Sequence, residues 1–273
     1  MLRTLMLAGI CAMFACQGST DPPVSFVAGL RVLGARADPP QVDPGGRATV
    51  TLLVADTTSR AATATWTRCL DAPLPGAAVN PDCVTRQTAP FLQAVGEGLM
   101  ITADMPEVAP GALGLPDVTN GVYLPLVARV TDGADTVVAV YRLRLGDGSP
   151  TNRNPAIAEV DVVGAGGVTA SLDGASPRVV HAGDALTLEV AFAPGSAETY
   201  AGPGGVTATE VLTTAWFCTA GALSFEQTSL AQPRTVLRLA DQLPSPGQTI
   251  DLYAVARDGR GGIDFVHRAL ELQ

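Results

Sequence analysis

The chain has 273 residues, with 26 acidic and 17 basic side chains, so its formal net charge at pH 7 is −9. The basic residues are all arginine and form no block along the sequence. Because nucleic-acid binding depends on neutralising phosphates, this composition excludes nucleic acid as an expected partner.

Residues 1–15 have the features of a secretory signal. Arg3 is followed by an apolar run from Leu5 to Ala15. At about 11 residues, this run is too short to cross a bilayer core of about 30 Å as a helix. A basic start and a short apolar stretch that ends in small residues are typical of a cleaved signal peptide. We therefore predict a signal peptide over residues 1–15, and no other apolar run is long enough to span a membrane.

Cys16 follows Ala15, and the polar stretch QGSTD comes directly after it. This arrangement resembles the lipobox of bacterial lipoproteins, in which a small residue precedes a cysteine that is acylated and becomes the first mature residue. The family usually has Leu three residues before the cysteine and a small residue two before it, where this chain has Met13 and Phe14. The resemblance implies lipid on Cys16 and, since Gln follows the cysteine, sorting to the outer membrane. The alternatives are a cleaved signal without lipid and an uncleaved anchor.

The sequence after the signal predicts strands. ATVTLLVA (48–55) and ALTLEVAF (185–192) alternate between apolar and polar residues, as half-buried strands do. No segment has a sustained helical period with caps. Other strand-like segments, bounded by Gly, Pro and Asp, are GLMITA (98–103), TVVAVYRLRL (136–145), RTVLRLA (234–240), TIDLYAVA (249–256) and IDFVHRALEL (263–272).

The chain also repeats itself. Residues 39–55 match 176–192, residues 64–69 match 214–218, and residues 124–145 match 251–272. Each copy has a strand entered through a Gly turn, a Trp strand and a final hairpin that turns on Asp-Gly. We predict a tether over 16–28, a first domain over 29–146, a Pro- and Gly-rich linker over 147–155 and a second domain over 156–273.

The predicted fold class is all-β, with two tandem immunoglobulin-like or fibronectin-like β-sandwich domains. A buried Trp on a central strand with a late hairpin resembles the immunoglobulin fold, although the usual pair of inter-sheet cysteines is missing. In style the chain is similar to uncharacterised lipoproteins of GC-rich Gram-negative soil bacteria, on the segments WFCTAG (216–221) and VARDGRGG (255–262). That family has no known activity that could be carried over to this chain, and no cofactor is expected.

Cysteine usage predicts one disulfide. If Cys16 carries lipid, three cysteines remain, and Cys69 and Cys83 bracket a turn-rich segment of the kind that a bridge closes in an oxidising compartment. The alternative is two free thiols. Cys218 lies two residues after Trp216, so both side chains point to the same face of a strand, and we place Cys218 in the core.

Neither metal binding nor catalysis is indicated by the residues available. The two histidines, His181 and His267, have no zinc-ligand spacing, and no nucleophile motif is present. Pairs of aspartates flank the Asp-Gly turns, and we assign them to turn formation rather than to calcium, which takes six to eight oxygens. These pairs are Asp132 with Asp135 and Asp258 with Asp264.

Taken together, these features predict a lipid-anchored protein of the cell envelope that acts as a non-enzymatic structural or binding module. Its partners would be the membrane, through lipid on Cys16, and another envelope protein or a polysaccharide. Tyr200, beside a Gly-rich insertion (194–205), is the candidate contact residue, since loops at the ends of sandwiches often carry function. The alternatives are a carbohydrate-binding or adhesion module, a subunit of an envelope complex and, less favoured, a hydrolase.

Overall fold

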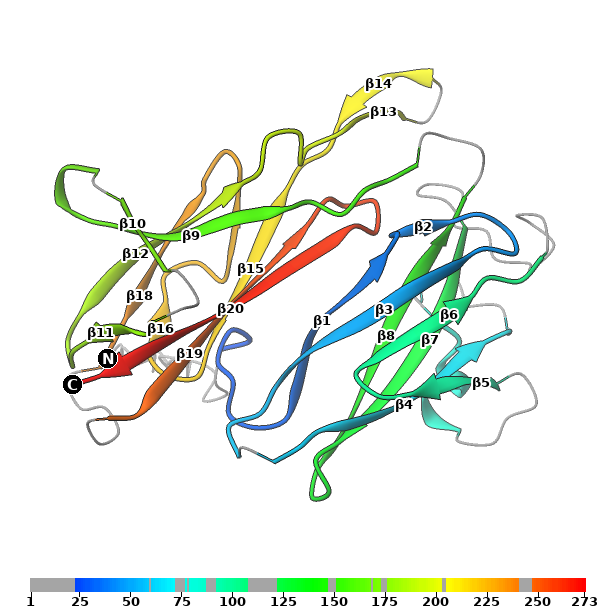
Figure 1. Ribbon diagram of the computed structural model, residues 1–273, viewed down its shortest axis with the longest axis horizontal. Coiled ribbons are helices and arrows are strands. Elements are labelled where there is room, and N and C mark those ends of the chain that lie inside the picture. The colour runs from blue at the N-terminus through cyan, green and yellow to red at the C-terminus, as the bar shows by residue number, and fades with distance from the viewer. Residues whose placement is uncertain are drawn as a thin grey trace, which may run out of the picture.

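The computed structural model describes residues 23–58, 60–71, 77, 79–86, 92–107, 122–146, 151–167, 169–172, 176–202, 205–240 and 247–273. These residues form two β-sandwiches that follow one another along the chain (Figure 1). The predicted all-β class is therefore correct. Within the described ranges there is no helix long and apolar enough to cross a membrane.

The first sandwich consists of two sheets. One sheet has the order β1-β3-β6 and the other has the order β2-β8-β7-β4-β5. Neighbouring strands are antiparallel except for β2 and β8, which are parallel. The elements are β1 (Arg31–Asp38), β2 (Gln41–Val42), β3 (Arg47–Ala55), β4 (Thr63–Cys69), α1 (Pro81–Thr85), β5 (Leu92–Glu97), β6 (Met100–Asp104), β7 (Val122–Thr131) and β8 (Thr136–Leu145).

The second sandwich has sheets of order β10-β9-β12-β18-β16 and β11-β20-β19-β15-β17, and a separate β13-β14 hairpin extends from it. Its elements are β9 (Ile157–Val163), the 3-10 turn η1 (Ala165–Gly167), β10 (Thr169–Ser171), β11 (Arg178–Val180), β12 (Ala185–Phe192), β13 (Thr199–Ala201), β14 (Thr207–Thr209), β15 (Thr213–Cys218), β16 (Ala222–Leu223), β17 (Gln227–Ser229), β18 (Arg234–Arg238), β19 (Thr249–Arg257) and β20 (Ile263–Leu272).

The segments that repeat in the sequence occupy equivalent places in the two sandwiches. The short strands β2 and β11 each pair in parallel with the last strand of their sandwich, β8 and β20. The Trp strands β4 and β15 each pair with the first strand of the final hairpin, β7 and β19. The sequence repeat is therefore a repeat of structure.

Each sandwich has its own apolar core with a tryptophan inside it. Trp66 is 1% exposed and Trp216 is 0% exposed. The indole N–H of Trp66 donates to the carbonyl of Gly98 at 3.0 Å, and that of Trp216 donates to Oγ1 of Thr228 at 2.9 Å. Because both indoles have a polar partner, neither Trp carries a burial penalty for its N–H. Cys218 packs with Trp216 in the second core, as predicted.

The two sandwiches pack against each other through a third apolar cluster. Val27, Leu33 and Ala55 come from the segment before β1 and from the first sandwich; the second contributes Phe217, Tyr253 and Val255. Figure 1 shows β1 running alongside β19 and β20, with the first residues of the described chain between them. The outer face of the β19 sheet is thus covered by protein.

The segment that joins the sandwiches takes part in this contact. Asn154 donates from Nδ2 to the carbonyl of Ala37 on β1 at 2.7 Å, and its Oδ1 accepts from the amide of Ile263 on β20 at 2.9 Å. One side chain in the predicted linker therefore bonds to both sandwiches. Arg36 and Asp264 add an ion pair of 2.8 Å across the same contact.

Candidate functional site

The predicted attachment residue, Cys16, and the tether up to residue 22 lie outside the described residues. The described chain begins at Pro23, and Ser25–Val27 form what we call the docking segment. Its backbone adds to the edge of β15, because the amide of Val27 donates to the carbonyl of Cys218 and the amide of Cys218 donates to the carbonyl of Ser25, both at 2.9 Å. The base of the tether is therefore attached to the second sandwich.

Side chains reinforce this attachment. The backbone amide and the hydroxyl of Ser25 donate to the carboxylate of Glu226 at 3.2 and 2.9 Å. Arg31 donates from Nη1 to the carbonyls of Val24 and Phe26, and its guanidinium lies 5.2 Å from the centre of the Phe217 ring. The direction in which the chain leaves the body at residue 24 is thus held by backbone and side-chain bonds together.

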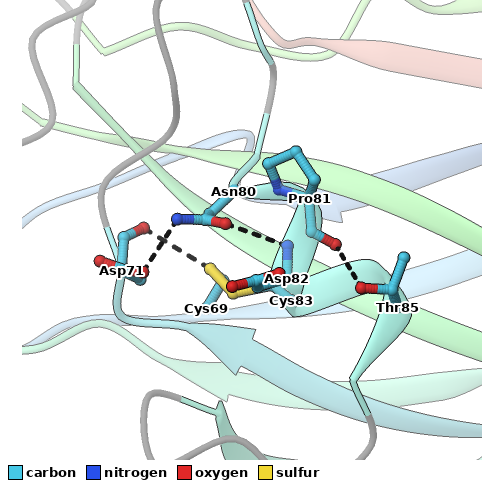
Figure 2. The surroundings of a disulfide bond; sticks show 7 residues. All are labelled: Cys69, Asp71, Asn80, Pro81, Asp82, Cys83 and Thr85. Carbon is cyan, nitrogen blue, oxygen red and sulfur yellow. Dashed lines mark hydrogen bonds between the residues drawn. A yellow bond between two sulfur atoms is a disulfide. The ribbon is translucent and has the colours of Figure 1, made fainter.

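The predicted disulfide between Cys69 and Cys83 is present, with 5.8 Å between the two Cα atoms (Figure 2). Cys69 ends β4 and Cys83 lies in the short helix α1. Asn80 caps that helix by accepting from the amide of Asp82 at 3.0 Å, and Pro81 occupies its first turn. Both are favoured residues at a helix start. The sequence does not predict this helix, because a single turn leaves no periodic pattern.

The bridge holds α1 against the outer face of the first sandwich. Cys69, Cys83 and Val79 form an apolar cluster with Val127 of β7, which is 1% exposed. Val127 points away from the main core, so without this cover it would face water. Arg129, two residues further along β7, donates to the carbonyl of Val84 and ties down the other end of the helix.

A buried polar cluster surrounds the turn between β19 and β20. Arg260 donates from Nη1 to Oε1 of Glu210 at 2.8 Å, and the guanidinium lies 4.4 Å from the centre of the Tyr200 ring. Asp258 accepts from the amides of Arg260 and Gly262 at 2.7 and 2.9 Å and from Nδ2 of Asn152 at 2.8 Å. These bonds join the turn to the linker and to the β13-β14 hairpin.

Charge in this cluster is partly compensated. Burial raises the pKa of Glu210, while its hydrogen bonds from the backbone and from Arg260 act in the opposite direction. The first sandwich also reaches the turn, since Arg144 donates to the carbonyl of Arg260 at 3.2 Å. The cluster is therefore a polar part of the inter-sandwich contact.

Tyr200, the predicted contact residue, is half-buried rather than fully exposed. It lies on β13 of the hairpin formed by the Gly-rich insertion, and its ring is stacked by Arg260. The ring is thus used to hold the hairpin on the body of the second sandwich. We find no free aromatic platform at this position.

The two histidines lie in different surroundings. Nε2 of His267, on β20, is 2.7 Å from Oδ1 of Asp251 on β19, and its ring stacks on Tyr253 at 4.8 Å. Burial, with the charge of Asp251 adding to it, raises the pKa of Tyr253 to about 12. His181 lies in an exposed turn 3.7 Å from Asp184. The two histidines therefore have different partners and do not form one site.

The aspartates at the two Asp-Gly turns bind backbone amides. Oδ1 of Asp132 accepts from the amides of Ala134 and Asp135 at 2.8 and 2.7 Å, and Oδ2 is 3.2 Å from Nη1 of Arg60. Asp264 accepts from Arg36 and from the amide of Ile157, each at 2.8 Å. Among the residues that the structure describes, no three His, Cys, Asp or Glu side chains gather as metal ligands.

Cys218 is buried as a free thiol, and burial raises its pKa to about 11. A thiol with such a pKa carries little thiolate at neutral pH, so it is poorly reactive. The backbone amide and carbonyl of Cys218 form the hydrogen bonds to the docking segment.

No family of known proteins matches the chain, and no curated protein matches it in sequence. Among solved structures, the chain is similar to the N-terminal Ig1-2 module of the Drosophila receptor protein tyrosine phosphatase DLAR. The similarity has 12% identity and a TM-score of 0.26, and it covers 90% of this chain and 99% of that one. At these values it carries no information on function.

Sequence reasoning missed the docking segment and the contacts of Asn154. Ser25, Phe26 and Val27 were assigned to the tether, because a short segment rich in Pro and Ser has no strand pattern. One signal was present: Phe26 and Val27 are the first consecutive large apolar residues after the signal peptide. An apolar pair in a polar tether indicates that the tether ends there.

Proposed function

We propose that the chain is a lipid-anchored protein of the cell envelope, held at the outer membrane through Cys16. Its two sandwiches act as one non-enzymatic structural or binding module. The small residue before Cys16 and the polar stretch after it support the anchor. The observation that carries the module is the apolar and polar contact that joins the sandwiches.

Three features support a single rigid scaffold rather than two independent domains joined by a flexible linker. An apolar cluster fills the contact, with Val27 and Val255 both 0% exposed. Asn154 bonds to both sandwiches, and Arg260 lies between them with its carbonyl bonded to Arg144. Relative motion of two domains in one chain is the usual expectation unless apolar surface holds them together.

The singled-out polar residues support a structural role over a catalytic one. Asp132 and Asp258 accept from amides of their own turns and so shape them. The prediction that Asp264 also forms a turn is wrong, because its carboxylate instead accepts from the amide of Ile157 on β9 and from Arg36 on β1. His267 is an exposed partner of Asp251 on neighbouring strands. A hydrolase would need such groups to converge on a substrate, whereas the polar groups at the contact between the sandwiches bond to one another and to the backbone.

The anchor is tested by comparing the wild-type chain with the Cys16→Ser variant, both expressed in a Gram-negative host. We expect the wild type in the membrane fraction, released by detergent and not by high salt, and the variant in the soluble envelope fraction. Cys218→Ala is the matched control, since it removes a cysteine that is buried in the core. The proposal fails if Cys16→Ser fractionates like the wild type.

The module is tested by cross-linking and capture from detergent-solubilised envelopes, with the Cys16→Ser variant as the unanchored control. A constant protein or polysaccharide partner of the wild type would support binding. Turnover of a substrate by the purified chain, abolished by His267→Ala, would contradict the non-enzymatic role.

A further inference from the structure

The docking segment determines which sandwich lies nearest to the anchor. Although the first sandwich follows the tether in sequence, Ser25 and Val27 are bonded to Cys218 on β15 of the second sandwich. Glu226, in the loop before β17, adds two bonds to Ser25. The tether therefore leaves the body at the β15 edge of the second sandwich, next to β1 of the first sandwich, whose Arg31 bonds to the carbonyls of Val24 and Phe26.

Two large apolar side chains are exposed beside that exit. Val24 is 66% exposed and Phe225 is 62% exposed. Each lies one residue away from the hydrogen bond between Ser25 and Glu226. We call these two residues the exit patch. Both side chains present apolar surface to water, and moving that surface out of water is favourable.

The tether is too short to hold this patch far from a bilayer. Val24 is eight residue steps along the chain from Cys16, and a fully extended chain spans at most about 3.5 Å per step, or about 28 Å in total. A tether of random conformation is much shorter than this limit. If acyl chains on Cys16 are inserted in the membrane, the exit patch is held at a high effective concentration next to the lipid surface.

We infer that the exit patch rests on the lipid surface, with Phe225 and Val24 inserted among the headgroups, so that the second sandwich is the membrane-proximal one. This inference rests on the proposed lipid anchor. In Figure 1, the dark-blue docking segment lies between the second sandwich and β1 of the first.

The test uses the acylated full chain in vesicles of phosphatidylethanolamine and phosphatidylglycerol that contain lipid with a nitroxide on its acyl chain. A single environment-sensitive fluorophore is attached at position 225 in Phe225→Cys. The matched control carries it at position 100 in Met100→Cys, because Met100 is also apolar and 63% exposed but lies on β6 of the first sandwich. Val24→Cys is a second probe of the patch if Phe225→Cys does not fold.

We expect the fluorophore at 225 or 24 to shift to shorter emission wavelength and to be quenched by the nitroxide lipid, while the one at 100 is unaffected. The intact mass of each sample shows separately whether Cys16 carries lipid. Acylated protein without quenching at 225 and 24 overturns the inference and leaves the anchor standing. Protein without lipid on Cys16 overturns both. A blue shift at 225 that occurs equally without vesicles also overturns it, since a protein contact would then cover the patch.

Discussion

At the scale of single residues, the aspartates of the two Asp-Gly turns act mainly on the backbone. Asp132 shows this clearly: its carboxylate is enclosed by two amides of its own turn and by Arg60. The backbone bonds from Asp135 and Ala134 are the largest cause of a pKa lowered to about 2, and Arg60 adds to it. The sequence pointed to turn formation at this Asp-Gly site, because Asp and Gly are the residues that such turns need.

This pKa predicts a specific dependence of stability on pH. Because the folded pKa of Asp132 lies below the ordinary value of 3.8, its stabilisation is present above about pH 4 and is lost as the pH falls towards 2. The Asp132→Asn variant lacks this titration. We therefore expect the denaturant midpoint of the wild type to fall more steeply between pH 4 and pH 2 than that of Asp132→Asn. Asp135→Asn, in the same turn, is the control and should follow the wild type. Equal slopes for the wild type and Asp132→Asn would contradict this role.

At the scale of elements, the sequence predicted strands well where one face is exposed. β12 alternates between buried and more accessible residues along its length, and it matches the predicted segment 185–192. β7 and β19 differ, because consecutive residues are buried on both faces. What covers their outer faces is distant in sequence or irregular: the disulfide-bonded helix over β7, and β1 with the docking segment over β19. A local pattern cannot reveal such partners.

The disulfide gives the element-scale prediction. Its two cysteines are 14 residues apart in sequence, and closing a loop of this length stabilises a fold by about 3 kcal/mol in the chain-entropy model. We expect the double variant Cys69→Ala, Cys83→Ala to lose about 2–4 kcal/mol in the free energy of unfolding. Urea unfolding measures this loss.

Reduction provides the control for that experiment. A reducing agent should bring the wild type close to the double variant and leave the variant unchanged. If the wild type without reductant already unfolds at the same urea concentration as the variant, the bridge does not stabilise the first sandwich.

At the scale of the whole molecule, the contact between the sandwiches is the part that the sequence could not supply. The repeat predicted two copies, and the composition of residues 147–155 predicted a linker, but neither says how the copies meet. Asn154 looks like an ordinary linker residue in the sequence, yet its amide group bonds to β1 and to β20. Side chains that are far apart in the chain determine how the two domains pack.

Removing this amide should weaken the contact. In Asn154→Ala, the carbonyl of Ala37 and the amide of Ile263 lose their side-chain partner, at a cost of about 1–3 kcal/mol for each group that stays buried without one. We expect lower stability and faster hydrogen exchange at the amide of Ile263. Arg153→Ala is the matched control, because the neighbouring Arg153 side chain is 85% exposed. If the two variants exchange at the same rate, Asn154 does not join the sandwiches.

The account as a whole depends on Cys16 being the point of attachment. The most direct measurement is the intact mass of the mature protein isolated from its own membranes. We expect a chain that begins at Cys16 and carries a diacylglycerol and an acyl group, less two hydrogens for the Cys69–Cys83 bridge. A chain that begins elsewhere, or that begins at Cys16 with no lipid, would contradict the anchor and with it the membrane-proximal placement of the second sandwich.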